Sequence, residues 1–423
     1  MNLRIGPYPL TLRELSGGLG DLGVLIPLEA ALIAVNGLNP TTTLLGVGAI
    51  YILAGLYFRI PMPVQPLKAL SVIAIAHSSA PAVIAAAALL MAGALALLSV
   101  TRAISLLEKV FALPVVRGVQ IGLGLLLLKS AYQMVFQRPF LLDGQQSYLD
   151  VGSLSVHTGA LLGLGSVVLL LLLVRLRAGP ATLVVVGVGV AVGLLASESS
   201  SVWRLGPMPV SFGAPSAGDF WTALVLLVAP QLPLTLANSV FATADAAKSY
   251  FGEQATKATP TRIAFSIALG NLWAGLTGGL PNCHGSGGLT AHYRLGARTP
   301  LATTFLGLVL IGIALLFGRS AWEVRSLLPA ATLGALLFYV GVQHIFLGLK
   351  VKTTVQLSLA VIVAAVSTVF GGNLAIGAAV GLALYWSSRW LSKRYGWQPQ
   401  DGKAAHPFLT RMIGALERIV PSG

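Results

Sequence analysis

The chain has 423 residues, of which 56% are hydrophobic and only 9% are charged, and its mean hydropathy of +0.84 excludes a set of soluble domains and indicates a membrane protein. The formal charge of +14 does not indicate a nucleic-acid-binding protein, because Lys and Arg are scattered singly between apolar runs and are not clustered with aromatic residues. The positive charge therefore needs another explanation.

Apolar runs that could cross a bilayer recur along the chain, since a spanning helix needs about 20 apolar residues. In chain order, full spans are expected at 16–36, 41–58, 80–100, 114–135, 157–176, 181–197, 220–247, 260–278, 300–318, 327–347, 354–370 and 373–391. Two further stretches, 61–77 and 280–294, are too short or too interrupted by Pro and Gly to cross alone. We expect these to be half-spanning helices preceded by extended chain, which a membrane tolerates only where the irregular backbone lines a cavity enclosed by protein.

The distribution of positive charge supports counting both broken stretches as passes, which gives fourteen transmembrane segments with both termini in the cytoplasm. Most Lys and Arg residues then lie in cytoplasmic loops, as the positive-inside rule requires. Dropping either broken stretch would invert every loop between the two and remove this asymmetry. The exceptions are Lys129, Arg138, Arg204, Arg319 and Arg325 on the outside, and Lys68 inside a membrane segment.

The broken stretches occupy matching places, third and tenth, which predicts two copies of a seven-segment unit in opposite orientations. Chance recurrence of proline is the alternative, since the sequence holds 23 prolines. The residues that recur at nearly constant offset are Leu113-Pro114 and Leu328-Pro329, Pro63 and Pro281, and Pro27 and Pro233. The predicted units are a first repeat at 1–197, a polar loop at 198–218, a second repeat at 219–392 and a short cytoplasmic tail at 393–423, in which 406–420 is expected to form a basic amphipathic helix.

The two half-helices are predicted to form an anion site where they begin. Pro66 is expected at the first position of one helix, which leaves the N–H groups of Leu67, Lys68 and Ala69 free. Ser286 is expected to cap the other, where Gly287 and Gly288 let a ligand approach the backbone closely. Two helix N-termini that converge at mid-membrane, with the charge of Lys68, favour an anion. The candidate binding residues are Gln65, Leu67, Lys68, Ala69, Asn238, Cys283, His284, Gly285, Ser286, Gly287 and Gly288.

Several of these side chains also have purely structural explanations. Gln65 could bond to the frayed backbone of its own turn, and Lys68 could pair with a carboxylate in the membrane. Cys283 could be a small buried hydrophobe, and His284 a neutral interior histidine bonded to a carbonyl. Since no second His or Cys is near these two, no metal site is expected, and no cofactor motif is present.

Carboxylates inside a membrane are costly and need a reason, so we consider Asp21, Glu29 and Asp245 as sites of proton coupling, together with His284. Asn238 and Asp245 share one face of the eighth span, seven residues apart. The alternative is that Asp21 and Asp245 lie near the cytoplasmic membrane surface, where water makes a charge inexpensive.

Four stretches resemble the signature sequences of the molybdate transporter family, which is related to the SulP sulfate permeases. The resemblance covers almost the whole membrane region in the right order. It implies the fold shared by sulfate permeases and uracil permeases, with a core domain from segments 1–4 and 8–11, a gate domain from segments 5–7 and 12–14, and substrate between segments 3 and 10. The stretches are GDLGVLIP at 20–27, PMPVQPLK at 61–68, PQLPLTLANS at 230–239 and GGLPNCHGSGGLTAHYRLGAR at 278–298.

The resemblance also sets expectations for individual features. Asn238 falls where related permeases often carry an acidic residue, and an amide there would suit an oxyanion better. The sulfate permeases usually carry a cytoplasmic STAS domain after the membrane part, whereas the tail here is too short to fold as a domain. Related permeases are often dimers through the gate domain, so a homodimer is possible.

Together these features predict an all-α polytopic protein of a bacterial inner membrane that imports molybdate by secondary active transport. Proton symport is attractive because a dianion entering a negative interior needs a driving force of about 2.3 kcal/mol per charge per 100 mV. The alternatives are a permease for sulfate or another tetrahedral oxyanion, and an anion channel of the same fold. An enzyme is not expected, because no catalytic constellation accompanies the broken helices.

Overall fold

The computed structural model describes residues 3–5, 7–19, 22–101, 103–104, 112–138, 148–151, 154–176, 181–196, 204–210, 213–327, 329–351, 353–370 and 373–395. Asp21 and the predicted tail helix at 406–420 lie outside these residues.

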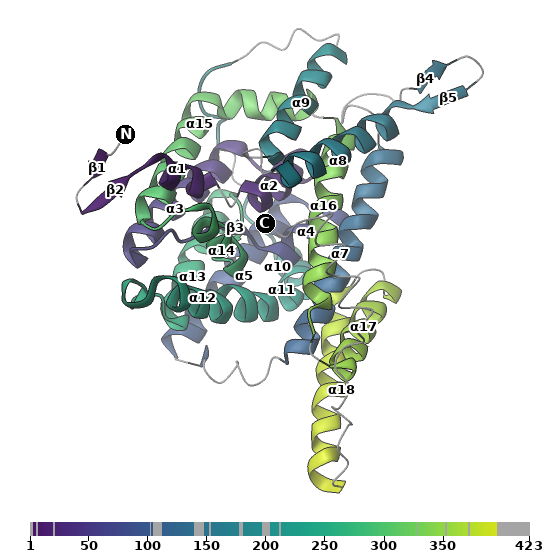
Figure 1. The fold of residues 1–423 in the computed structure, drawn as a ribbon. Helices are drawn as coiled ribbons and strands as arrows, with labels where there is room; N and C mark the ends of the chain where they lie inside the picture. Colours follow the sequence, from purple (N-terminus) through teal and green to yellow (C-terminus); the bar gives the residue numbers. More distant parts are fainter. Residues whose placement is uncertain are drawn as a thin grey trace.

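Helices make up almost all of the described chain (Figure 1). The first half contains β1 (Leu3–Ile5), β2 (Tyr8–Leu10), α1 (Leu12–Gly18), α2 (Leu22–Asn36), α3 (Pro40–Phe58), β3 (Gln65–Pro66), α4 (Lys68–Ala76), α5 (Pro81–Val100), α7 (Leu113–Phe136), β4 (Tyr148–Val151), β5 (Leu154–His157), α8 (Thr158–Leu176) and α9 (Ala181–Ala196). The second half contains α10 (Ala217–Thr222), η2 (Ala223–Val228), α11 (Ala229–Leu234), η3 (Thr235–Phe241), α12 (Ala242–Phe251), η4 (Gly252–Ala255), α13 (Pro260–Thr277), β6 (Asn282–Cys283), α14 (Ser286–Leu295), α15 (Pro300–Leu327), α16 (Ala330–Leu349), α17 (Thr354–Val369) and α18 (Leu374–Tyr395).

The starts of several helices follow from local sequence. Asn39 caps α3 by accepting from the N–H groups of Thr41 and Thr42, and Thr259 caps α13 by accepting from Arg262 N. Proline stands in the first turn of both helices, where its missing N–H removes no hydrogen bond. Each such cap stabilises its helix by about 1 kcal/mol.

Most described helices follow the predicted spans, and their length and composition indicate an integral membrane protein. The span predicted at 16–36 was wrong at its start, since α1 ends at Gly18 and α2 begins at Leu22. By length and composition, seven of them can cross a membrane, and shorter apolar helices lie at Leu25–Asn36, Val184–Ala196 and Thr354–Val369. The eighth predicted span is one continuous helical segment, Ala217–Ala255, in which η2 and η3 are π-helical turns. Between these turns lie Pro230 and Pro233, which lack N–H donors, so local widening of the helix is expected there.

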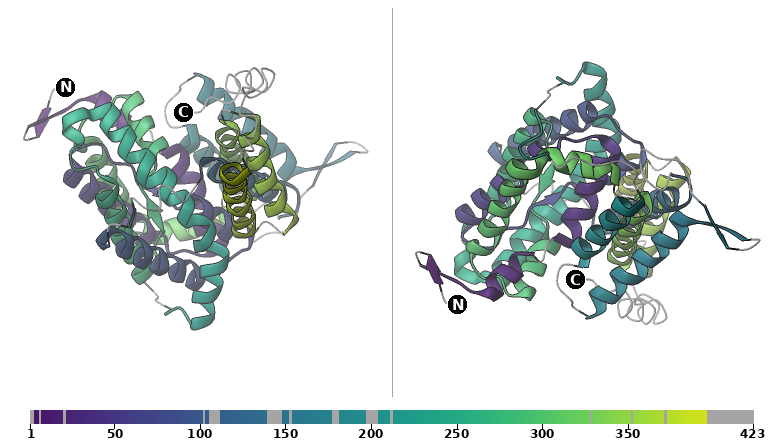
Figure 2. Two further views of the ribbon diagram at one scale, coloured as in Figure 1. Left: turned by 90° about the horizontal axis from the view of Figure 1, so that it is seen from below. Right: turned by 90° about the horizontal axis from the view of Figure 1, so that it is seen from above.

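Helix packing sorts the described chain into two groups. In one, α3 packs along α15 and α5 along α13; in the other, α7 packs against α16 and α17, and α17 against α18. Figure 2 shows the second group, in blue and yellow-green, beside the purple, teal and green helices of the first. These helices belong to predicted segments 2, 4, 9 and 11 in the first group and to segments 5, 12, 13 and 14 in the second. Their roles as core and gate stay a prediction.

The same contacts have the pattern that a repeat would produce. In a seven-segment repeat, α3 would be equivalent to α13, α15 to α5, and α7 to α16. The contact of α3 with α15 is then equivalent to the contact of α13 with α5, and the contact of α7 with α16 is equivalent to itself. The opposite orientation of the two halves stays a prediction.

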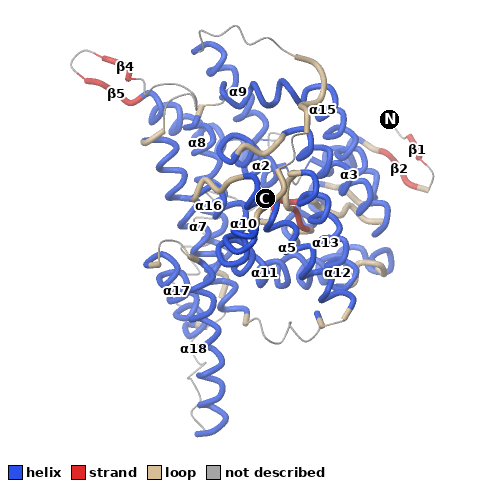
Figure 3. The backbone as a smooth tube through the Cα atoms, turned by 180° about the vertical axis from the view of Figure 1, so that it is seen from behind, coloured by secondary structure: helices blue, strands red, loops and turns tan. Residues whose placement is uncertain are grey.

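Three antiparallel pairs of short strands accompany the helices (red in Figure 3). The pair β3 with β6 matches the extended stretches predicted before the half-helices. The hairpins β1–β2 and β4–β5 were not predicted, because hydropathy selects membrane spans and carries no signal for strands outside them.

Candidate functional site

The two broken segments cross as a minimal antiparallel sheet inside the protein. Gln65 pairs with Cys283 and Pro66 pairs with Asn282, and the N–H of Leu67 donates to the carbonyl of Pro281 at 2.9 Å. The side chains at this crossing are buried, among them those of Val64, Gln65, Leu67, Asn282 and Cys283. The extended backbone is thus paired internally, as a membrane interior requires.

Each strand leads directly into a half-helix, and both helix starts differ from the prediction: α4 begins two residues later than expected and α14 begins one residue earlier. Leu67 is the N-cap of α4, so the prediction that Pro66 opens the helix was wrong, since Pro66 belongs to the strand. Gly285 is the N-cap of α14, so the prediction that Ser286 caps it was also wrong. Neither N-cap residue supplies a side-chain cap, and the first N–H groups therefore depend on other partners.

Five backbone N–H groups at the two helix starts have no acceptor among the described residues: those of Lys68, Ala69, Ser286, Gly287 and Gly288. The prediction that the N–H of Leu67 is free was wrong, because it donates to the carbonyl of Pro281 in the neighbouring strand. The N–H of Leu70, one turn into α4, donates to the Oε1 of Gln231 at 2.9 Å. Gly287 is exposed, and a Cβ built on it would meet no atom within 4 Å. The start of α14 therefore faces open space with unpaired donors, which suits an anion.

Lys68, the first residue of α4, is half-buried and forms no ion pair with any carboxylate that the structure describes. Its helix, α4, packs against α7 of the other group of helices. The alternative in which Lys68 pairs with a carboxylate thus has no partner among the described residues. Lys68 instead adds positive charge where the two groups of helices meet.

Asn238 and Ser286 are brought together from distant parts of the chain. The hydroxyl of Ser286 donates to Oδ1 of Asn238 at 3.0 Å, and both residues are partly exposed. Asn238 lies in the π-helical turn η3, a kind of turn that is frequent at functional sites. With its Oδ1 bound to Ser286, Asn238 retains its amide N–H₂ group as the donor for a ligand.

His284 connects three segments. Its Nδ1 lies 2.7 Å from the carbonyl of Pro63, which can only accept, so Nδ1 carries the proton and Nε2 accepts from the hydroxyl of Ser266 at 2.8 Å. The carbonyl of His284 accepts from Thr243 at 2.7 Å. These bonds match the structural explanation for His284. Cys283 is also buried, with its Sγ 3.8 Å from the carbonyl of Pro66.

The carboxylates differ in position. Glu29 is only 6% exposed on α2, which packs against β3, and no donor among the described residues reaches its Oε1. Asp245 is exposed in the first turn of α12. Asp21 lies outside the described residues. Of the predicted coupling residues that the structure describes, Glu29 is therefore the buried carboxylate.

Gln231 is a site residue that the sequence analysis did not single out. Its side chain is buried; Oε1 accepts from Leu70 N at 2.9 Å, and Nε2 donates to Thr235 Oγ1 at 2.7 Å. It thus caps the half-helix α4 from a segment about 160 residues away. The sequence feature that could have identified it is a polar amide side chain between the two prolines of PQLPLTLANS, inside an otherwise apolar span.

Replacing Gln231 with leucine is expected to lower the free energy of unfolding by about 1–3 kcal/mol, because the N–H of Leu70 then remains buried without an acceptor. Gln231→Glu keeps an acceptor at this position and is the control for loss of the hydrogen bond. Denaturant unfolding in detergent measures both. Equal stability of Gln231→Leu and the unmodified chain would contradict the proposed capping.

Comparison with known proteins places these features in a family. A family model described as "Molybdate transporter of MFS superfamily" matches residues 13–127 and 223–343, which lie in the two halves of the chain and include both crossing segments. "Molybdate transporter 2" of Arabidopsis thaliana is 33% identical, covering 88% of this chain and 86% of the relative. "Molybdate transporter 1" of Chlamydomonas reinhardtii is 30% identical, covering 79% of this chain and 83% of the relative.

Solved structures show the same fold at low sequence identity. The transmembrane domain of the cyanobacterial bicarbonate transporter BicA superposes with a TM-score of 0.62 at 18% identity, covering 90% of this chain and 98% of that one. The murine anion transporter Slc26a9 in its inward-facing state gives a TM-score of 0.66 at 17% identity, covering 93% and 70%. The fold is therefore that of SulP-type anion transporters, and the chain belongs to the molybdate transporter family.

Proposed function

We propose that this protein imports molybdate by secondary active transport coupled to protons. The observation that carries the proposal is the meeting of two half-helix starts at the β3–β6 crossing, where five backbone N–H groups have no acceptor among the described residues and Lys68 adds a positive charge. Such an arrangement binds an oxyanion through directed donors. The molybdate transporters among its relatives support the choice of molybdate.

In this proposal the oxyanion lies between the starts of α4 and α14. The N–H groups of Ala69, Gly287 and Gly288 donate to its oxygens, together with the amide N–H₂ of Asn238 and the side chain of Gln65. The hydroxyl of Ser286 donates to Oδ1 of Asn238 and so orients that amide toward the oxyanion. Movement of the core helices against the gate helices then exposes the site to each side in turn. Both termini lie in the cytoplasm, as the distribution of Lys and Arg predicts.

Uptake of labelled molybdate into proteoliposomes tests the proposal. The unmodified chain is expected to show saturable uptake, and a Gln65→Ala, Ser286→Ala double variant is expected to lose most of it. Gln65→Ala removes a hydrogen bond to a charged ligand, worth about 1.5–3 kcal/mol, and Ser286→Ala removes the partner that orients Asn238. Unchanged uptake in the double variant would contradict the site. Competition by sulfate, tungstate and selenate then distinguishes a molybdate transporter from a general oxyanion permease, and conductance measurements distinguish either from a channel.

A further inference from the structure

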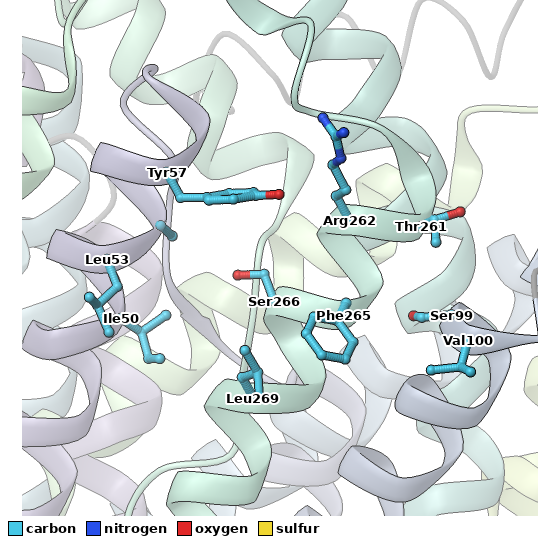
Figure 4. A pocket seen from close by; sticks show the side chains of 11 residues that line it. Ile50, Leu53, Tyr57, Ser99, Val100, Thr261, Arg262, Phe265, Ser266 and Leu269 are labelled. Carbon is cyan, nitrogen blue, oxygen red and sulfur yellow. The ribbon is translucent and has the colours of Figure 1, made fainter.

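A cavity of about 530 Å³ lies on the outer side of the first helix group, between α3, α5 and α13 (Figure 4). Its walls are mainly apolar, and several wall residues are strongly exposed: Leu53 at 62%, Val100 at 74% and Leu269 at 50%. Large apolar side chains exposed on transmembrane helices face the acyl chains of the bilayer. The cavity is thus open to lipid and does not belong to the β3–β6 crossing.

One end of the cavity is positively charged. Arg262, in the first turn of α13, forms part of its wall, and Figure 4 shows its side chain at the same end as Tyr57. The ammonium of Lys257 lies 5.0 Å from the centre of the Tyr57 ring, and Arg59 follows α3 directly. Glu253 is an acidic residue in the connection before α13. Three cations therefore lie near this end, which the topology predicts to be cytoplasmic, where anionic lipid headgroups are attracted to basic residues.

We propose that this cavity, formed by α3, α5 and α13, binds one anionic phospholipid. An acyl chain of the lipid lies along Leu53, Phe265 and Leu269, and its phosphate contacts Arg262 and Lys257. The division of the cavity into an apolar body and a cationic end matches the two parts of such a lipid. A zwitterionic lipid also carries a phosphate, but its choline cation offsets the attraction of the cationic end, so a lipid with net negative charge is favoured.

The bound lipid also contacts Ser266, a wall residue that is hydrogen-bonded toward the β3–β6 crossing. Ser266 lines the cavity, and its hydroxyl donates to Nε2 of His284, whose Nδ1 bonds to Pro63. The occupant is therefore one side chain away from the residues that hold β3 against β6. A lipid in the cavity stabilises the hydrogen bonds from Ser266 to His284 and from His284 to Pro63, because it keeps other partners away from the Ser266 hydroxyl.

Native mass spectrometry of the full chain, taken from nanodiscs that contain phosphatidylcholine with a quarter phosphatidylglycerol, tests the binding site. Arg262→Gln is expected to retain about five-fold less phosphatidylglycerol, since each basic residue near a membrane contributes on the order of that factor. Leu269→Trp fills the cavity and is expected to abolish retention. The matched controls are Arg389→Gln, an exposed arginine on α18, and Leu276→Trp, an exposed leucine two turns further along α13.

The site would be overturned if all four variants retained equal amounts of phosphatidylglycerol, or if the unmodified chain did not retain phosphatidylglycerol in preference to phosphatidylcholine. Arg262 is exposed, so its substitution leaves folding intact even if the tryptophan variant fails to fold.

The connection to the crossing is tested by the unfolding temperature in the two lipid mixtures. Phosphatidylglycerol is expected to raise this temperature for the unmodified chain, and Ser266→Ala is expected to lose the increase. Ser99→Ala is the control, because Ser99 lines the same cavity but donates to the carbonyl of Leu95 in its own helix. An increase that persists in Ser266→Ala would contradict the connection. Both measurements are independent of transport, so their outcome is separate from that of the molybdate experiment.

Discussion

Gly285→Ala is expected to abolish molybdate uptake and to lower the free energy of unfolding by about 1–3 kcal/mol, the usual effect of overpacking a buried site. A Cβ at this position would overlap the side-chain Oε1 of Gln65, which is itself fully buried. The backbone of Gly285 has a φ of −84°, so the effect comes from the collision and not from the backbone conformation. Either β3 moves away from β6 or Gln65 leaves the site. Uptake assays and denaturant unfolding of the same preparation measure both effects.

Gly287→Ala is the matched control for this substitution. A Cβ at Gly287 meets no atom within 4 Å, so the stability should change much less, while a methyl group beside an open N–H should weaken binding of the oxyanion. Combining Gly285→Ala with Gln65→Ala removes the group that the new methyl meets and should restore most of the lost stability. If Gly285→Ala were as stable as the unmodified chain, the close packing of the crossing would be wrong.

Glu29→Gln is expected to remove the dependence of uptake on external pH. In the unmodified chain, uptake should rise as the external pH falls from 8 to 5, because proton binding accompanies entry of the dianion. Glu29 is the buried carboxylate on α2 beside β3, and its Oε1 has no donor among the described residues. Such a group can exchange a proton between the two orientations of the transporter, whereas glutamine cannot. Proteoliposomes with a fixed internal pH provide the measurement.

Asp245→Asn serves as the control for the loss of a carboxylate. Asp245 is exposed on α12, so this substitution should leave the pH profile unchanged. A profile that is already flat in the unmodified chain would argue against proton coupling altogether. A profile that remains steep in Glu29→Gln would exclude Glu29 as the coupling residue and direct attention to Asp21.

The accuracy with which the sequence predicts helix bounds differs from segment to segment. The helices α3, α5 and α13 lie within one residue of their predicted bounds at both ends, because a long apolar run framed by Pro, Asn or Thr has few other ways to cross a bilayer. The start of α15 was also predicted, but the helix continues to Leu327 and so passes the point where hydropathy declines. The hydropathy of a segment thus locates its membrane part and not the full helix.

The candidate site was predicted in outline and corrected in detail. The placement of Gln65 and Cys283 on paired strands agrees with the expectation that the broken segments converge. The role of Ser286 changed from a cap to the partner of Asn238, and Gln231 was added as the acceptor for Leu70. These pairings join residues far apart in the sequence. Local propensity carries no information about such partners, so no local pattern could have assigned them.

By itself, the sequence determined that this protein lies in a membrane, where most of its helices are, which two segments are broken and which family it belongs to. Each of these depends on composition, hydropathy or local motifs, and a bilayer allows few solutions for such patterns. Only the tertiary structure decided the register of Gln65 against Cys283, the bonds that make His284 a connection between segments, and the cavity that ends at Arg262. These features arise from the packing of distant helices, in which the partner of each buried polar group depends on the arrangement of the whole chain.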